Sequence, residues 1–186
     1  MKSIQRNQGG FSLVEILLVL GIIAILAIAA FIIFPQVQAS NRANTERANL
    51  MAVTAGTKNL FGSTREYSGT TNTILNQARI FPSLMNGGVY TGGVITSSWG
   101  GTVTVEGAFA TGLPDTVAPA PFFRIVYSAV PSEVCSKLVP GLTQNYSAIY
   151  VDSGTTPTVL ATTPAAIASA CAPTGFNVVN VVLVSN

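Results

Sequence analysis

The chain has 186 residues, which corresponds to about one domain of typical size plus an additional segment. Nine Lys and Arg residues and seven Asp and Glu residues give a net charge of +2, and the mean hydropathy is +0.50, which is too apolar for an ordinary cytosolic domain. The balanced charge argues against a strongly electrostatic nucleic-acid binder. The chain has no histidine, which excludes His-ligated metals and nucleophile pairs that use His.

The N-terminus combines a short basic leader with a long apolar segment. Residues 1–10 carry Lys2 and Arg6 and no acid, and Ile16 to Phe34 form 19 residues without a charge. As a helix this segment is about 28 Å long, close to the thickness of a bilayer core. The next charge is Arg42, so the positive-inside rule predicts one transmembrane helix with a cytoplasmic N-terminus and the rest of the chain outside.

A cleaved secretory signal is the alternative interpretation of this segment. Ala27-Ile28-Ala29 fits a small-x-small cleavage site after Ala29. Such cleavage would leave an unburied apolar tail, and Glu15 at the entrance of the apolar region disfavours insertion. We therefore prefer a helix that is retained.

Glu15 has two interpretations. Ser12-Leu13-Val14-Glu15 fits a capping box, in which the carboxylate accepts from a backbone N–H at the helix start. Alternatively, an acid this close to membrane depth is kept for a partner, because an unpaired ionisable group there is costly.

Gly10-Phe11-Ser12-Leu13-Val14-Glu15, followed by the apolar segment, resembles the class III signal of type IV pilins and pseudopilins. The resemblance implies that a prepilin peptidase cuts after Gly10 and methylates the new N-terminus at Phe11. It also implies that Glu15 neutralises the positive N-terminus of a neighbouring subunit in the filament core. Residues 1–10 are then a cleaved leader and residues 11–34 a helix half that serves the membrane and the filament core.

Residues 35–61 predict a second, amphipathic helix half. Pro35 lacks a backbone N–H and would kink a continuing helix or end it. If both halves form one bent helix, it runs from Ser12 to Phe61. Two apolar stripes and an opposing polar side follow the helical period; they are, in that order, Val37, Ala48, Met51 and Ala55; Ala43, Leu50, Val53 and Leu60; and Asn41, Arg42, Asn44, Glu46 and Arg47.

Residues 62–186 form a head whose glycine and threonine content and low charge favour short strands and turns. Apolar segments bounded by turn residues predict strands at Val89 to Ile95, Thr102 to Phe109, Phe122 to Val130, Ser147 to Val151 and Phe176 to Val184. Both alternating sets of the last strand are apolar, which predicts a central strand covered on both faces, once by the long helix. Short helices are expected at Thr73 to Ile80, before Pro82, and at Ser132 to Val139, with Ser132 as N-cap and Pro140-Gly141 as the stop.

Cys135 and Cys171 are the two cysteines. Outside the cytoplasm they predict one intramolecular disulfide, with two buried thiols as the alternative. The residues Pro131 to Leu138, Trp99 to Val103 and Cys171 resemble the PilS-like branch of type IVb pilins. The ten-residue leader and Phe11 resemble type IVa pilins instead.

Other motifs are weak. Gly87-Gly88 and Gly92-Gly93 are typical of turns and not of a phosphate loop. Scattered acids indicate a solvated surface and not a calcium site: Glu106, Asp115, Glu133 and Asp152. Asn145-Tyr146-Ser147 fits a glycosylation triplet, which arises often by chance.

The expected fold is α+β, with a long N-terminal helix packed on an antiparallel β-sheet head. The resemblance implies the major subunit of a type IV pilus, which is a structural protein without a cofactor or a nucleic-acid partner. The implied partners are prepilin peptidase, an assembly ATPase with its inner-membrane platform, an outer-membrane secretin and further copies in a helical filament. The implied location is the bacterial inner membrane before assembly and the extracellular pilus afterwards, for attachment, conjugation or motility. The alternatives are a pseudopilin of a type II secretion system, a minor pilin acting as adhesin or receptor and, with no acid-base or metal constellation to support it, a membrane-anchored enzyme.

Overall fold

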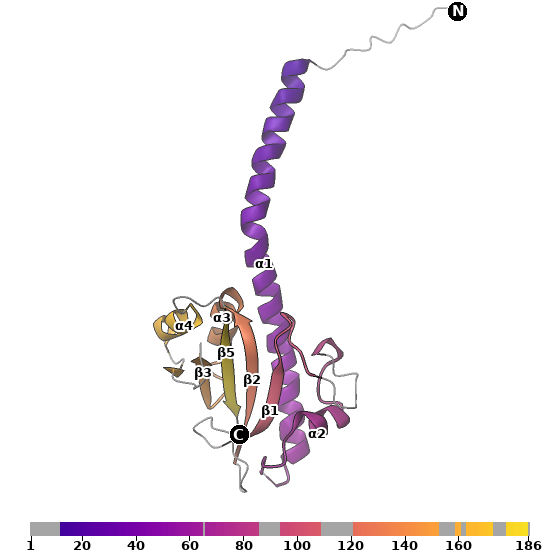
Figure 1. Ribbon diagram of the computed structural model, residues 1–186, viewed down its shortest axis with the longest axis vertical. Coiled ribbons are helices and arrows are strands. Elements are labelled where there is room, and N and C mark those ends of the chain that lie inside the picture. The colour runs from indigo at the N-terminus through magenta and orange to yellow at the C-terminus, as the bar shows by residue number, and fades with distance from the viewer. Residues whose placement is uncertain are drawn as a thin grey trace, which may run out of the picture. The chain divides into compact units, whose positions relative to one another are not determined.

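The computed structural model describes residues 12–64, 66–85, 94–108, 121–152, 159–160, 163–172 and 178–185. The chain divides into two compact units, Met1–Gln38 and Ala39–Asn186. Helix α1 contributes to both units. The elements, labelled in Figure 1, are α1 (Leu13–Phe61), α2 (Asn72–Gln77), β1 (Val103–Ala108), β2 (Phe122–Pro131), α3 (Ser132–Leu138), β3 (Ala148–Asp152), β4 (Val159–Leu160), α4 (Pro164–Cys171) and β5 (Val178–Ser185), with 3₁₀ turns at Ser83–Met85 and Val139–Gly141.

Helix α1 is continuous over 49 residues. At its start the backbone N–H groups of Glu15 and Ile16 donate to the Ser12 carbonyl at 3.0 and 3.2 Å. Pro35 lies inside the helix, which continues through it instead of ending there. Proline cannot donate a backbone hydrogen bond, which weakens the helix locally. A kink at Pro35 stays a prediction.

The sheet has five antiparallel strands in the order β1-β2-β5-β3-β4. As predicted, the last strand is central: β5 pairs with β2 on one side and with β3 on the other, with Leu183 opposite both Ile125 and Ile149. A bulge interrupts the pairing of β2 after Tyr127, where Ala129 has φ +52°. The bulge shifts the register between β2 and β5 by one residue, so that Val130 and Pro131 pair with Val179 and Val178.

The core lies between the C-terminal part of α1 and one face of the sheet (Figure 1). Its largest buried side chains include Tyr127 and Phe123 of β2, Leu183 of β5, and Leu50 and Val53 of α1. Helix α2 is joined to the edge strand β1 by one side chain: Asn72 donates to the Val103 carbonyl at 2.7 Å and accepts from the Val105 N–H at 2.8 Å.

Several predicted features of α1 differ from the structure. Buried positions recur at steps of four and three: Ala39, Ala43, Glu46, Leu50, Val53 and Thr57. The predicted stripe of Ala43, Leu50 and Val53 is therefore confirmed, except that Leu60 is 44% exposed. The other stripe is wrong, since Val37 and Met51 are about half exposed. Glu46, assigned to the polar side, is fully buried because partners in the head satisfy its carboxylate.

Further corrections concern the head. The N-cap of α3 is Pro131, with no side-chain cap bond, and not Ser132. The predicted Val89 to Ile95 strand lies mostly outside the described residues, and Val94 and Ile95 are not in a strand; only Thr96 forms a bridge, with Thr102. Helix α4 was not predicted, although Thr163 caps it by accepting from the Ala166 N–H at 3.2 Å and Pro164 occupies its first turn.

Candidate assembly site

The N-terminal half of α1, Leu13–Phe34, presents an apolar surface. Its large hydrophobic side chains are about half exposed or more, from Val19 at 48% to Phe31 at 81%. In the part of the chain that the structure describes, α1 is the one helix long and apolar enough to cross a membrane. An apolar surface of this extent is unstable in water and requires lipid or protein around it.

Glu15 is the acidic residue in the first turn of α1, at the start of this exposed half. Between residues 12 and 64, and in the other described segments, its carboxylate has no hydrogen bond or ion pair. In particular, the bond from Glu15 to the Ser12 N–H that a capping box requires is not formed there. The carboxylate at the start of the apolar surface is thus in a position to receive a partner from outside the chain.

The predicted cleavage and methylation positions, Gly10 and Phe11, lie outside the described residues. Only their sequence separation from Glu15 is known, and Phe11 lies four residues before it.

The C-terminal half of α1, Ala39–Phe61, is held in the head by a buried carboxylate. Glu46 accepts from the backbone N–H of Ser98 at 2.6 Å, from the Tyr127 hydroxyl at 3.2 Å and, at 3.4 Å, from Asn49. Burial, followed by the nearby Glu46 charge and hydrogen bond, raises the pKa of Tyr127 well above its usual value, so this hydroxyl remains a donor at neutral pH. Sequence reasoning missed the site, although the four-three spacing from Ala39 to Leu50 places Glu46 on the buried side.

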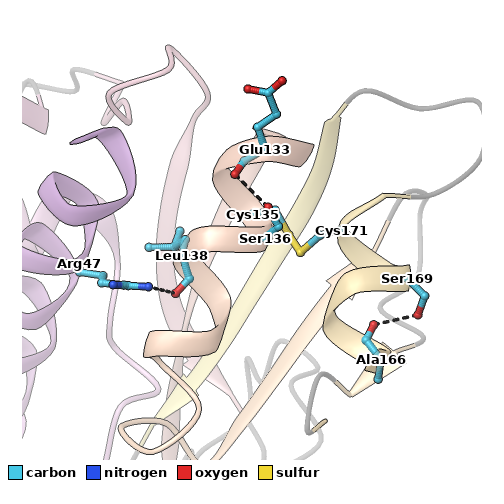
Figure 2. The surroundings of a disulfide bond; sticks show 8 residues. All are labelled: Arg47, Glu133, Cys135, Ser136, Leu138, Ala166, Ser169 and Cys171. Carbon is cyan, nitrogen blue, oxygen red and sulfur yellow. Dashed lines mark hydrogen bonds between the residues drawn. A yellow bond between two sulfur atoms is a disulfide. The ribbon is translucent and has the colours of Figure 1, made fainter. Parts of the chain in front are cut away.

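Arg47, the next residue of α1, connects this helix to α3. Arg47 donates to the carbonyl oxygens of Lys137 and Leu138 at the C-terminal end of α3, with the Leu138 contact at 3.4 Å (Figure 2). Lys137 itself donates to the Ser40 hydroxyl at 2.9 Å. These contacts satisfy terminal carbonyls of α3 and attach that helix to α1.

The disulfide predicted from the cysteine count is present. Cys135 of α3 and Cys171 of α4 are bonded, are fully buried, and have Cα atoms 5.5 Å apart (Figure 2). The bond therefore joins α3, which Arg47 attaches to α1, with α4, which precedes the central strand β5.

The other candidate residues show no common site. Glu106 pairs with Arg124 at 2.6 Å across β1 and β2, and Glu133 is exposed in the first turn of α3. Asp152 ends β3, whereas Asp115 and the two glycine pairs lie outside the described residues. Asn145 is exposed beside the buried Tyr146. Among the described residues, no three His, Cys, Asp or Glu side chains form a group that could hold a metal ion.

Comparisons with known proteins identify the family. The family model described as PilS N terminal matches residues 40–186, and the prokaryotic N-terminal methylation motif matches residues 5–31. The crystal structure of TcpA, a type IV pilin from Vibrio cholerae El Tor biotype, is similar with a TM-score of 0.50. The similarity covers 80% of this chain and 99% of that chain at 15% identity, so it concerns the fold alone. No curated protein sequence matches the chain.

The two family matches cover different parts of the molecule. The methylation motif includes Gly10, Phe11 and Glu15, and the PilS match includes the C-terminal half of α1, the sheet and the disulfide. The resemblance expected from the sequence is confirmed, and pilins are structural subunits and not enzymes. Because the PilS match spans more than half of its length, the chain belongs to the PilS family, and its methylation motif and fold are those of a type IV pilin.

Proposed function

We propose that this chain is the major subunit of a type IV pilus. The observation that carries the proposal is the N-terminal half of α1, whose uncharged segment from Ile16 to Phe34 has exposed large hydrophobic side chains. A surface of this kind suits two environments, the bilayer and a bundle of identical helices. Assembly would move the helix from the first environment to the second.

Processing prepares the subunit for this transfer. A prepilin peptidase removes residues 1–10 on the cytoplasmic side and methylates Phe11. Lys2 and Arg6 leave with the leader, so the side-chain charge falls from +2 to zero. The cytoplasmic N-terminus follows the positive-inside rule applied to the precursor.

Glu15 would direct the assembly step. In lipid its carboxylate has no partner within the described chain, which is costly. In the filament the methylated amine at Phe11 of a neighbouring subunit would lie against it, and such a buried pair selects one register between subunits. An assembly ATPase with its inner-membrane platform and an outer-membrane secretin complete the proposed set of partners.

Mass spectrometry of surface filaments sheared from cells tests this function. We expect this chain to be their principal protein and to begin at methylated Phe11. A variant with Gly10→Ala keeps its leader and remains in the inner membrane, which gives the control. A trace amount in filaments made of another pilin would instead indicate a minor pilin, and a mature start at Met1 or Ala30 would contradict the proposed processing.

A further inference from the structure

The N-terminal half of α1 carries a continuous apolar seam on one side of the helix. Its residues recur at alternating steps of four and three, which is the spacing by which two parallel helices pack against each other. They are Ile16, Leu20, Ile23, Ala27, Ala30 and Phe34. All of them are exposed, so the seam is available to a second helix.

The seam has an open hollow at Ala27 and Ala30. Phe31 and Phe34 line the hollow together with these two alanines, and its volume is about 420 Å³. A cavity of about 150 Å³ is already enough to bind benzene. The rings of Phe31 and Phe34 are themselves 81% and 63% exposed. The same stretch of helix therefore offers both a space for an aromatic ring and rings that a neighbour can bury.

A second hollow lies beside Glu15. It has a volume of about 310 Å³ and is lined by Glu15, Ile16, Val19 and Leu20. Because Ile16 and Leu20 belong to the seam, this hollow lies on the same side of the helix as the first one. The acid that the proposed function pairs with a neighbouring amine thus borders the seam, and a single neighbouring helix can reach both hollows.

A spacing of four residues occurs three times along this helix, each time between complementary groups. The pairs are Phe11 and Glu15, Ala27 and Phe31, and Ala30 and Phe34. The first pair would join an amine to an acid, and the other two join a small side chain to a large one. Two parallel helices displaced by four residues, or about 6 Å, bring the members of every pair to the same level. Without a displacement, Phe34 would meet Phe34 of the neighbour and the hollow would stay empty.

We propose that a second copy of the chain packs along the seam with this displacement, so that Phe31 and Phe34 of one subunit lie against Ala27 and Ala30 of the next. The inference rests on the proposed function, since it specifies how one α1 meets another in the filament. Small residues let helices approach closely in an apolar medium, whereas large residues at the same level hold them apart. The charge pair at Glu15 and the ring contacts then specify one register.

An exchange of large and small residues tests this register with the full-length protein in cells. Ala30→Phe fills the hollow, and we expect about tenfold fewer surface filaments or less, because overpacking weakens the helix contact. Adding Phe34→Ala exchanges the residues that share a level, so we expect this double variant to regain filaments. Adding Phe31→Ala instead removes a ring at another level and is the matched control, which we expect not to regain them.

Ala27→Phe provides an independent second set of variants. Its filaments should return with Phe31→Ala and not with Phe34→Ala, so the two sets have opposite rescue patterns. Membrane level and leader removal are measured for every variant, because a change among apolar residues should leave both steps intact.

Electron microscopy counts of surface filaments give the result. Rescue only by the partner at the same level supports the four-residue displacement. Equal counts in the two double variants of a set would overturn it, and normal filaments in Ala30→Phe would overturn it by showing that the hollow is left to lipid. Either result leaves the proposed function standing as long as wild-type filaments consist of this chain. Wild-type cells whose filaments lack this chain would contradict the proposed function itself.

Discussion

The two halves of α1 have the same backbone conformation and opposite surroundings. From Leu13 to Phe34 the large hydrophobic side chains are exposed in the isolated chain. From Ala39 to Phe61 one face is buried in the head, and Glu46 and Arg47 contact residues that follow them by 52 to 91 positions. The N-terminal half of the helix thus presents an apolar surface, whereas its C-terminal half is fixed in the head by polar contacts and apolar packing.

The comparison also separates two acids of α1 with different surroundings. Glu15 has no partner in the described chain, whereas Glu46 has three. Both would be costly in an apolar medium if left alone. Folding of the head satisfies Glu46, whereas Glu15 would be satisfied by a second subunit in the proposed filament.

Removal of the disulfide should give the largest change in the stability of the head. It closes a sequence separation of 36 residues, for which the chain-entropy model gives about 4 kcal/mol of stabilisation. We expect Cys135→Ser to lower the free energy of unfolding of the head by up to about this amount and to reduce the pilus yield. Denaturant unfolding in detergent measures the first effect, and unchanged membrane insertion is the control. Free thiols at both positions in native filaments would contradict the role of the bond.

Two leucines of α1 provide a matched test of its halves. Leu50 is fully buried and Leu26 is 64% exposed. We expect Leu50→Ala to destabilise the head by about 3 kcal/mol, because it opens a cavity, and Leu26→Ala by less than about 0.5 kcal/mol. Chemical unfolding of both full-length variants measures the difference. Equal losses would show that the two halves do not differ as described.

Two arginines of α1 provide a smaller contrast. Arg47→Met removes the donors to the Lys137 and Leu138 carbonyls while keeping much of the side-chain length, and we expect a loss of about 1 to 2 kcal/mol. Arg42→Met, at an exposed position of the same helix, should cost less than about 0.5 kcal/mol. Thermal unfolding of the two variants tests this, and a larger loss in Arg42→Met would be the contrary result.

The smallest expected effect is on the stability of the head at alkaline pH, and it arises from Tyr127. The pKa of Tyr127 is raised in the folded state, mainly by burial, so its contribution to stability is complete below the ordinary value of 10.0 and is lost as pH rises through the higher folded value. Tyr127→Phe removes that loss. We therefore expect the stability of this variant to fall less steeply above pH 10.0 than that of the wild type. Parallel slopes would assign the alkaline loss to other groups, such as Tyr146.

Local signals predicted most of the elements. The central position of β5 followed from its apolar faces, and the disulfide followed from two cysteines in a domain expected outside the cytoplasm. Helix α4 was missed, although Thr163-Pro164 is a start signal, because its small residues have no strong apolar period. Such a helix is identified by its caps and not by its pattern.

The polar contacts of the head could not be predicted in the same way. Glu46 is buried because Ser98 and Tyr127 reach it, and these residues are 52 and 81 positions away. An acid on an amphipathic helix is usually solvated, so the residue type argued for a surface position although the spacing of Glu46 matches the buried side. Only the fold brings together the donors that make burial of this acid possible.

The proposed assembly role of Glu15 can be tested with one substitution. We expect the Glu15→Ala protein to reach normal membrane levels, to lose its leader normally and to keep the unfolding stability of the head, but to form almost no surface filaments. The reason is that removing this acid eases insertion into lipid and removes the partner of the amine at Phe11. Ser12→Ala is the control for the capping-box interpretation, under which loss of a cap would cost only about 1 kcal/mol. Electron microscopy counts the surface filaments of both strains. We predict near-complete loss in Glu15→Ala with normal filaments in Ser12→Ala, and normal filaments in Glu15→Ala would contradict the pairing of Glu15 with the amine at Phe11.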